Sequence, residues 1–429
     1  MRITRHYLTI NGRRVHYRRA GKGPPLLMVH QSPRSSAEYD GLMRDWGAHF
    51  TCIAPDTPGF GQSDPLAKPD ADIDDFADAL IAFVRALGLT HVAAYGFHSG
   101  AIILVTALKR DPHLFSGLAI GGYAIWTAQE MAIFGEAYLP PLLPSAYGEH
   151  LVWLWNRMLE QSWFFPWFDI RDQARLSVAH ADVARVHAAV LEMLDAGDAY
   201  RIGYGAVLRA PRDIPPPDAV TPPVLISAYD GDPLQAHIDR LGAMPRGWAA
   251  RKIATPAEHQ ALSLAFLQQL PAAACPALAA DAVSGFYHLS TGQFDGLVHV
   301  DGDDIDLPGH GLSDGWPGTP PTDWAAWRDV VHRLRDDYGL TVKLPPLPKG
   351  DPEHFYPELA PDRFGAHLLA AWGIARARAL FDPWYDVAAA NVLPVDAARL
   401  DPARLARDTL AILRGRAAKA LHIARLGEE

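Results

Sequence analysis

His98 is the residue whose type and surroundings most directly predict chemistry. It stands in the middle of the sequence Gly-Phe-His-Ser-Gly, after small, β-prone residues at 92–95 and before an apolar run at 102–108. We expect a strand, a sharp turn and a helix, because small residues two positions either side of the apex let strand and helix backbones pass close together. An imidazole there could attack an acyl carbon, or take a proton from water or from a carbon acid.

The start of a helix should also set the charge of this imidazole. The positive end of the helix dipole disfavours an imidazolium, so we expect the ring of His98 to be neutral, which both roles require. Ser99 lies one residue past the apex, on the first helical turn. Its side chain should point away from the reacting position, so its hydroxyl is not assigned as the nucleophile.

The segments around His98 follow the order of a parallel α/β sheet. Short, continuous apolar runs are typical of strands buried on both faces, and they occur at 25–30, 50–55, 118–120 and 223–229. A last strand is expected at 251–254. Alternating residues around Asn-Gly predict a hairpin over 6–18, and an amphipathic pattern predicts a helix over 74–87.

The turn at His98 resembles the nucleophile elbow of the α/β-hydrolase family, whose pattern is Gly-x-Ser-x-Gly. The sequence Asp-Thr-Pro-Gly-Phe-Gly-Gln-Ser-Asp at 56–64 is a second mark of that family. The resemblance spans roughly residues 5–270 and implies a mostly parallel sheet flanked by helices, with a helical cap. The chain departs from the family at the apex, where the family has Ser, Cys or Asp.

The resemblance also implies roles for residues elsewhere in the chain. Asp232, with Asp230 as the alternative, matches the family's acid, and His259 matches its catalytic histidine. His259 would then be a second proton carrier held by Asp232. The backbone N–H groups of Gln31 and Ser99 would form the oxyanion hole, which does not depend on the apex side chain.

The resemblance divides the first part of the chain into a core and a cap. The core would comprise residues 1–122 and 216–272, and the helical cap would comprise the aromatic-rich segment 123–215. Most of these aromatic side chains should pack the cap onto the core. We expect the substrate pocket to be lined by His30, Trp126, Trp155 and Trp163.

Residues 273–429 repeat parts of the preceding sequence. The segment 306–314 matches the turn 56–64, 250 positions earlier, and residues between 365 and 386 match residues between 148 and 169 at a constant spacing of 217. The repeat has no counterpart of the elbow or of the acid. We therefore predict that this segment is a truncated, non-catalytic copy with cap-like helices. Our hypothesis is that an ancestral dimer, joined through its caps, became one chain. The second half would then support the first and could close its active site.

Composition excludes several classes of function. The 429 residues carry a formal net charge of −10 and contain no run rich in Lys or Arg, which disfavours nucleic acid as a partner. Cys52 and Cys275 have no metal-ligand spacing, and no apolar run is long enough to span a membrane or to form a signal peptide. We expect a cytoplasmic protein that binds neither nucleic acid nor membranes and needs no cofactor.

These observations favour hydrolysis of an ester, a lactone or a related carbonyl compound through His98, Asp232 and His259. The substrate should be a small apolar or amphipathic organic molecule. Two alternatives stay open: a cofactor-free C–C lyase or other proton-transfer enzyme that uses the same residues, and a ligand-binding protein without catalysis. A zinc site formed by these three residues and His30 is a further hypothesis, and a homodimer stays open.

Overall fold

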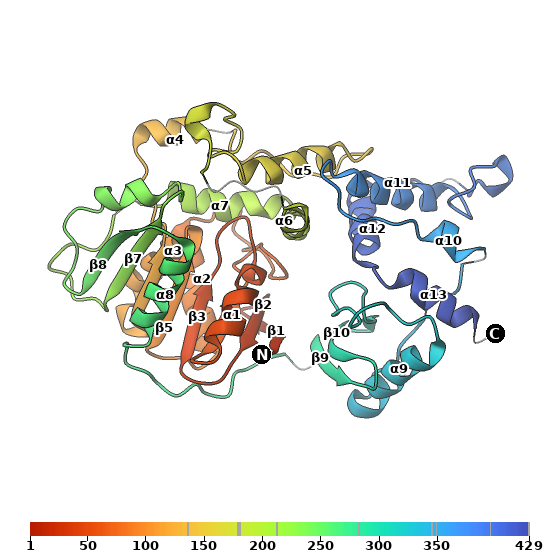
Figure 1. The fold of residues 1–429 in the computed structure, drawn as a ribbon, viewed down its shortest axis with the longest axis horizontal. Coiled ribbons are helices and arrows are strands. Elements are labelled where there is room, and N and C mark those ends of the chain that lie inside the picture. The colour runs from red at the N-terminus through yellow and green to blue at the C-terminus, as the bar shows by residue number, and fades with distance from the viewer. Residues whose placement is uncertain are drawn as a thin grey trace. The chain divides into compact units, whose positions relative to one another are not determined.

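The computed structural model describes residues 1–134, 137–177, 182–211, 213–281, 284–344, 346–348, 350–394 and 396–427. The chain divides into two compact units, whose elements are drawn in Figure 1. The first unit comprises residues 1–142 and 157–281, and the second comprises 143–156 and 282–429. This division assigns part of the predicted cap, residues 143–156, to the second unit. No helix among the described residues is long and apolar enough to cross a membrane.

An eight-stranded sheet forms the centre of the first unit. Its order is β1-β2-β4-β3-β5-β6-β7-β8; β2 pairs antiparallel with β1 and with β4, and the other neighbours are parallel. The mostly parallel sheet confirms the predicted α/β-hydrolase fold class. The strand bounds are β1 (Ile3–Ile10), β2 (Arg13–Ala20), β3 (Pro25–Val29), β4 (Thr51–Pro55), β5 (Val92–Phe97), β6 (Phe115–Gly121), β7 (Val224–Tyr229) and β8 (Trp248–Ile253).

Helices cover both faces of this sheet, because the central strands are apolar on both. Successive residues of a strand point to opposite faces: Leu27 belongs to the hydrophobic core that also contains residues of α2 and α3, and Leu26 belongs to the core that contains residues of α1 and α8. The helix bounds are α1 (Asp40–Trp46), α2 (Ile73–Ala86), α3 (Ser99–Arg110) and α8 (Pro256–Leu267).

The described parts of the segment between β6 and β7 are largely helical, as the sequence predicts for a cap. Helix α6 is fixed to the loop after β3, because the Glu192 carboxylate accepts two hydrogen bonds of 2.9 Å from the Arg34 guanidinium and one of 2.8 Å from the Ser35 N–H. The helix bounds are α4 (Ala128–Phe134), α5 (Glu149–Gln161), α6 (Val183–Ala196) and α7 (Tyr200–Arg209).

The second unit has a small antiparallel sheet in the order β11-β10-β9 and its own hydrophobic core. Trp327, on α9, is fully buried in that core beside Trp316 and Phe294. The bounds are β9 (Gly285–Ser290), β10 (Asp295–Asp301), β11 (Asp304–Asp306), α9 (Trp324–Tyr338), α10 (Pro352–Phe355), α11 (Ala366–Leu380), α12 (Pro402–Arg414) and α13 (Ala418–Leu426).

The two units contain turns with the same internal hydrogen bonds. Asp56 Oδ2 lies 2.8 Å from Nδ1 of His16, and Asp306 Oδ2 lies 2.8 Å from Nδ1 of His299. In each turn the serine seven residues later donates its hydroxyl to the carbonyl of that aspartate. Two further hydrogen bonds match. The Arg14 N–H donates to Asp64 Oδ2, as the Leu297 N–H donates to Asp314 Oδ2. The His16 N–H donates to Ser63 Oγ, as the His299 N–H donates to Ser313 Oγ.

Candidate active site

His98 occupies a strained turn between β5 and α3, as predicted. Its φ of 48° and ψ of −108° lie in a region that residues with a side chain rarely adopt, and its N–H donates to the Gly121 carbonyl at 2.8 Å. The flanking glycines are required because a Cβ on Gly100 would collide with the Val29 carbonyl, and one on Gly96 would lie 2.7 Å from Leu104 Cδ1. The sequence motif and the local backbone therefore agree.

The imidazole of His98 pairs directly with Asp232, which lies after β7. His98 Nε2 is 3.0 Å from Asp232 Oδ1; the His98 side chain is 24% exposed, whereas that of Asp232 is fully buried. The Leu234 N–H donates to the same carboxylate oxygen at 2.8 Å. Gly122 leaves room for the pair, because a Cβ there would collide with the His98 ring and lie 3.0 Å from Asp232 Oδ2.

The charge of Asp232 decides which nitrogen of His98 carries the proton. Burial alone would raise the pKa of Asp232, but the nearby His98 imidazole and the hydrogen bonds from His98 and the Leu234 N–H lower it below its usual value. An ionised carboxylate only accepts hydrogen bonds, so Nε2 of His98 donates and, in the neutral ring, Nδ1 keeps the lone pair. Nδ1 makes no hydrogen bond within the described residues.

The prediction that Asp232 holds His259 is wrong. His259 is only 2% exposed; its Nδ1 lies 2.8 Å from Ser227 Oγ, and its Nε2 lies 2.9 Å from the Tyr95 hydroxyl. The physical reason is the size of the apex side chain, since an imidazole at position 98 reaches the acid itself. Burial lowers the pKa of His259 to about 4, with Asp232 opposing and His98 reinforcing that shift, so its ring is neutral at pH 7.

The expected oxyanion hole is only partly available. The Gln31 N–H, one of the two predicted donors, donates to Glu38 Oε1 at 2.7 Å, and the Gln31 side chain donates to Oε2 at 3.0 Å. This corrects the prediction for Gln31, because its amide N–H is already bonded to the Glu38 carboxyl group. Ser99 opens α3, so its N–H is one of the amides without an intrahelical acceptor, and its predicted role stays a prediction.

Two of the predicted pocket residues are placed elsewhere. His30 is 1% exposed; its Nδ1 lies 2.9 Å from the Gln31 carbonyl oxygen, and its Nε2 accepts from the Thr57 N–H at 2.9 Å, so it stabilises loops. Trp155 belongs to the second unit, where its Nε1–H donates to the Arg363 carbonyl at 2.9 Å. Both assignments to the substrate pocket are therefore wrong.

The other two predicted pocket residues lie in the first unit. Trp126 packs edge-on against Phe134 and His237, with ring centroids 4.9 and 4.7 Å apart. Trp163 is 39% exposed, and its carbonyl accepts from the Leu176 N–H. Their role in substrate binding stays a prediction.

The zinc hypothesis finds no support in the side-chain positions. Within the described residues no group of three or more His, Cys, Asp or Glu side chains is arranged to hold a metal ion. His30 and His259 direct their ring nitrogens to other partners, so they do not converge with His98 and Asp232 on one point.

Sequence reasoning missed several residues around the pair. Tyr95 and Ser227 bind His259, Glu38 binds Gln31, and the ring of Phe97 stacks on that of His98 with centroids 4.3 Å apart. A signal existed for Ser227, because a hydroxyl within an otherwise apolar buried strand needs a hydrogen-bond partner. Glu38 lies seven residues after Gln31, in a short 3-10 helix (Ser36–Tyr39), and no spacing rule points to it.

Comparison with known proteins agrees with the fold. Residues 24–160 match the family described as alpha/beta hydrolase fold, so this segment carries that family's sequence pattern. Haloalkane dehalogenase 2 of Mycobacterium bovis is 32% identical over 121 residues, which are 28% of this chain and 42% of that protein. Soluble epoxide hydrolase of a Corynebacterium species is 36% identical over 103 residues, 24% of this chain and 35% of that protein.

A solved structure shows similarity over a longer part of the chain. The epoxide hydrolase from an endophytic Streptomyces aligns with a TM-score of 0.48 and 18% identity, covering 62% of this chain and 95% of that one. By sequence, the chain matches less than half the length of the two curated relatives named above.

Proposed function

We propose that this chain is a cofactor-independent hydrolase in which His98 and Asp232 act as a catalytic dyad on an ester, a lactone or a related carbonyl compound. The observation that carries the proposal is the 3.0 Å contact between His98 Nε2 and the buried Asp232 carboxylate, at the apex of a strained turn. The matched family and the hydrolases among the relatives support the same class of reaction.

The dyad favours His98 as a general base. Nδ1 would take a proton from a water molecule as its oxygen attacks the carbonyl carbon, and the resulting imidazolium would be stabilised by Asp232 at Nε2. The same Nδ1–H would then protonate the departing alkoxide, which regenerates the neutral ring. The Ser99 N–H, at the start of α3, would stabilise the negative charge on the carbonyl oxygen.

This scheme gives His259 a positioning role. It makes hydrogen bonds to Ser227 and Tyr95, and its ring is neutral at pH 7. Attack by Nδ1 on the acyl carbon is the variant of the mechanism, and it would leave an acyl-imidazole for water to split. The proton-transfer lyase uses the same dyad and differs only in the bond that breaks.

The apex imidazole favours carbonyl substrates over haloalkanes and epoxides, which appear in the names of the relatives. If Nδ1 displaced a halide or opened an epoxide, it would form an N-alkyl imidazolium, which lacks an acyl carbon for water to attack. We therefore expect a haloalkane or an epoxide at this site to alkylate His98 once, instead of being turned over.

Turnover of activated esters and lactones tests this proposal. The wild type should hydrolyse at least one of them, and His98→Ala should abolish that activity. Incubation with an epoxide should add one alkyl group per chain at His98, measured by peptide mass spectrometry. If only His98→Ser turns over esters, the natural chain is a binding protein or catalyses another reaction, and the hydrolase proposal fails.

We also propose that residues 273–429 derive from a truncated duplicate of the first part. The matching turns that begin at Asp56 and Asp306 support this, and so does a pair of isolated bridges, Phe164 with Arg175 and Phe381 with Val392, which are 217 positions apart. Their spacing equals that of the repeated sequence motif.

Reciprocal packing within the second unit supports an origin from a cap-to-cap dimer. The rings of His150 and Trp372 are 4.9 Å apart, and those of His367 and Trp155 are 5.2 Å apart. His367 lies 217 positions after His150, and Trp372 lies 217 positions after Trp155. A Cβ on Gly148 would lie 3.0 Å from the Trp372 ring, and one on its counterpart in the repeat would collide with the Trp155 ring. Such exchange of equivalent contacts is the property of a two-fold interface.

A further inference from the structure

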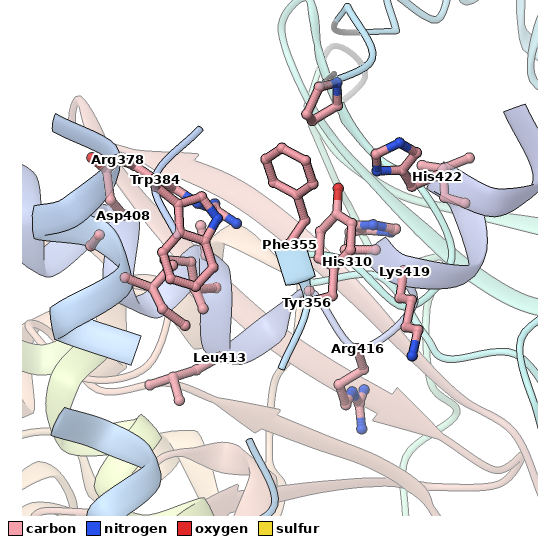
Figure 2. Close-up of a pocket in the computed structure, with 18 of the residues that line it drawn as sticks. His310, Phe355, Tyr356, Arg378, Trp384, Asp408, Leu413, Arg416, Lys419 and His422 are labelled. Carbon is pink, nitrogen blue, oxygen red and sulfur yellow. The ribbon is translucent and has the colours of Figure 1, made fainter. Parts of the chain in front are cut away.

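The second unit contains a large cavity, shown in Figure 2. Its volume is about 1450 Å³, which exceeds the range of roughly 300–1,000 Å³ common for small-molecule sites. Its described walls come from the turn at Asp306, from the segment 342–361 and from helices α11, α12 and α13. All the lining residues belong to the second unit.

The proposed duplication explains why this space is present. It pairs α5, α6 and α7 of the first copy with α11, α12 and α13 of the second. In the first unit α7 packs against α2 and α3, whereas in the second unit α13 packs against α9 and α10. The repeat lacks a counterpart of the elbow and of the helix after it, so the space that α3 fills in the first unit has no equivalent filling.

Most of the cavity wall is apolar. Figure 2 shows the Phe355 and Tyr356 rings between Trp384 on one side and His422 on the other, with Leu413 below Trp384 in this view. Phe355 and Leu413 are buried, with 5% and 9% of their surface exposed. Such walls fit an elongated apolar body better than a polar one.

A buried histidine in this wall has no polar partner among the described residues. His422 is 2% exposed, and neither of its ring nitrogens has a hydrogen-bond partner in the described part of the chain. Its ring lies 5.9 Å from that of Phe355 and 5.6 Å from that of Tyr356. Burial lowers the pKa of His422, so the neutral ring offers one donor and one acceptor. Unpaired buried groups are costly, and a polar ligand atom would relieve this cost.

Several cations line the cavity, and they differ in their acidic neighbours. Arg378 and Arg416 are exposed and form no hydrogen bond or ion pair with any described residue, whereas Lys419 pairs with Glu353. Acidic side chains also line the cavity, and one of them, Asp408, acts on Arg378 and lies 3.8 Å from Arg404. Arg416 is therefore the cation that remains for an anionic group at the solvent side of the cavity.

We propose that the second unit binds an amphipathic carboxylate, with its apolar body along Phe355 and Leu413 and its carboxylate at Arg416. His422 would supply a polar contact inside the cavity. This site lies within the second unit and contains no residue of the His98–Asp232 dyad, so the inference does not depend on the proposed hydrolysis.

Titration calorimetry on the full chain tests this inference, with decanoate as the carboxylate and 1-decanol as its uncharged counterpart. We expect decanoate to bind the wild type and His98→Ala equally. Arg416→Gln should weaken decanoate about tenfold without changing the affinity for decanol, because it removes only a charge-assisted contact. Leu413→Trp should fill the cavity and weaken both ligands at least tenfold.

Circular dichroism melting and light scattering control for unfolding and self-association. Arg416 is exposed, so its substitution should leave the melting temperature unchanged even if Leu413→Trp fails to fold. The inference is overturned if decanoate does not bind, if its affinity is the same in Arg416→Gln, or if His98→Ala abolishes binding. It is also overturned if the wild type is a dimer that Leu413→Trp dissociates, because a second copy would then be the occupant.

Discussion

Replacing Asp232 by Asn should separate the charge of this side chain from its shape. The Asp232 side chain is fully buried and lies 3.0 Å from His98 Nε2, so the substitution removes a buried charge-assisted hydrogen bond and the charge that stabilises an imidazolium. One such bond contributes about 1.5–3 kcal/mol, and the wrong tautomer of His98 adds a further loss. A total of about 3–4 kcal/mol corresponds to a fall in kcat of roughly 10²–10³-fold.

The assay is steady-state hydrolysis of the best ester or lactone substrate, with kcat and KM measured separately. Asp230→Asn is the matched control, because Asp230 is exposed and its carboxylate accepts from the Gln235 side chain at 2.6 Å. We expect this control to retain activity within about threefold. An Asp232→Asn enzyme that keeps kcat within threefold of the wild type would refute the dyad, and an equal loss in Asp230→Asn would reassign the acid.

Three further predictions concern packing and pH. Gly122→Ala should lower kcat more than tenfold, since its Cβ would displace the His98 ring. The unfolding free energy of the wild type should fall between pH 7 and pH 4, because the pKa of His259 is about 4 in the folded state and 6.5 in the unfolded state. The stability from the neutral ring is present above pH 6.5 and is lost as the pH falls toward 4. In denaturant titrations of His259→Gln, this fall should be smaller by about 2–3 kcal/mol. Trp155→Ala and Trp372→Ala should each lower the unfolding free energy by about 3–5 kcal/mol. The two losses should be similar, because the packing of the two tryptophans is reciprocal.

Two of these predictions have a matched control, and the third compares its own two variants. Gly12→Ala imposes a similar positive φ without any atom within 4 Å of the new Cβ, so it should leave kcat unchanged. The exposed His49→Gln should not alter the pH dependence of stability. A difference above 2 kcal/mol between the two tryptophan variants would contradict reciprocal packing. If Gly12→Ala and Gly122→Ala lowered kcat equally, backbone strain alone would be the cause.

The local sequence predicted the sheet and the elbow because short-range rules govern both. Continuous apolar runs are typical of parallel strands buried on both faces, and the glycines at 96 and 100 permit the close approach that the turn requires. The repeated spacing of 217 residues also predicted two related segments.

The hydrogen-bond partners within the site could not be predicted in the same way. The family's order of residues placed Asp232 and His259 together, but the imidazole at position 98 pairs with Asp232 and leaves His259 to Ser227 and Tyr95. The choice between these partners depends on side-chain length and on distances between loops that are far apart in sequence.

The sequence by itself thus determined the fold class and the residue at the apex of the turn, because backbone conformation at Gly-x-His-x-Gly and burial of apolar strands are local properties. Only the tertiary structure decided which carboxylate His98 binds, that Gln31 donates to Glu38, and that Trp155 packs in the second unit. These pairings depend on three-dimensional separations of a few ångströms, and hydrogen bonds and ring contacts weaken over such distances in a way that no spacing along the chain records.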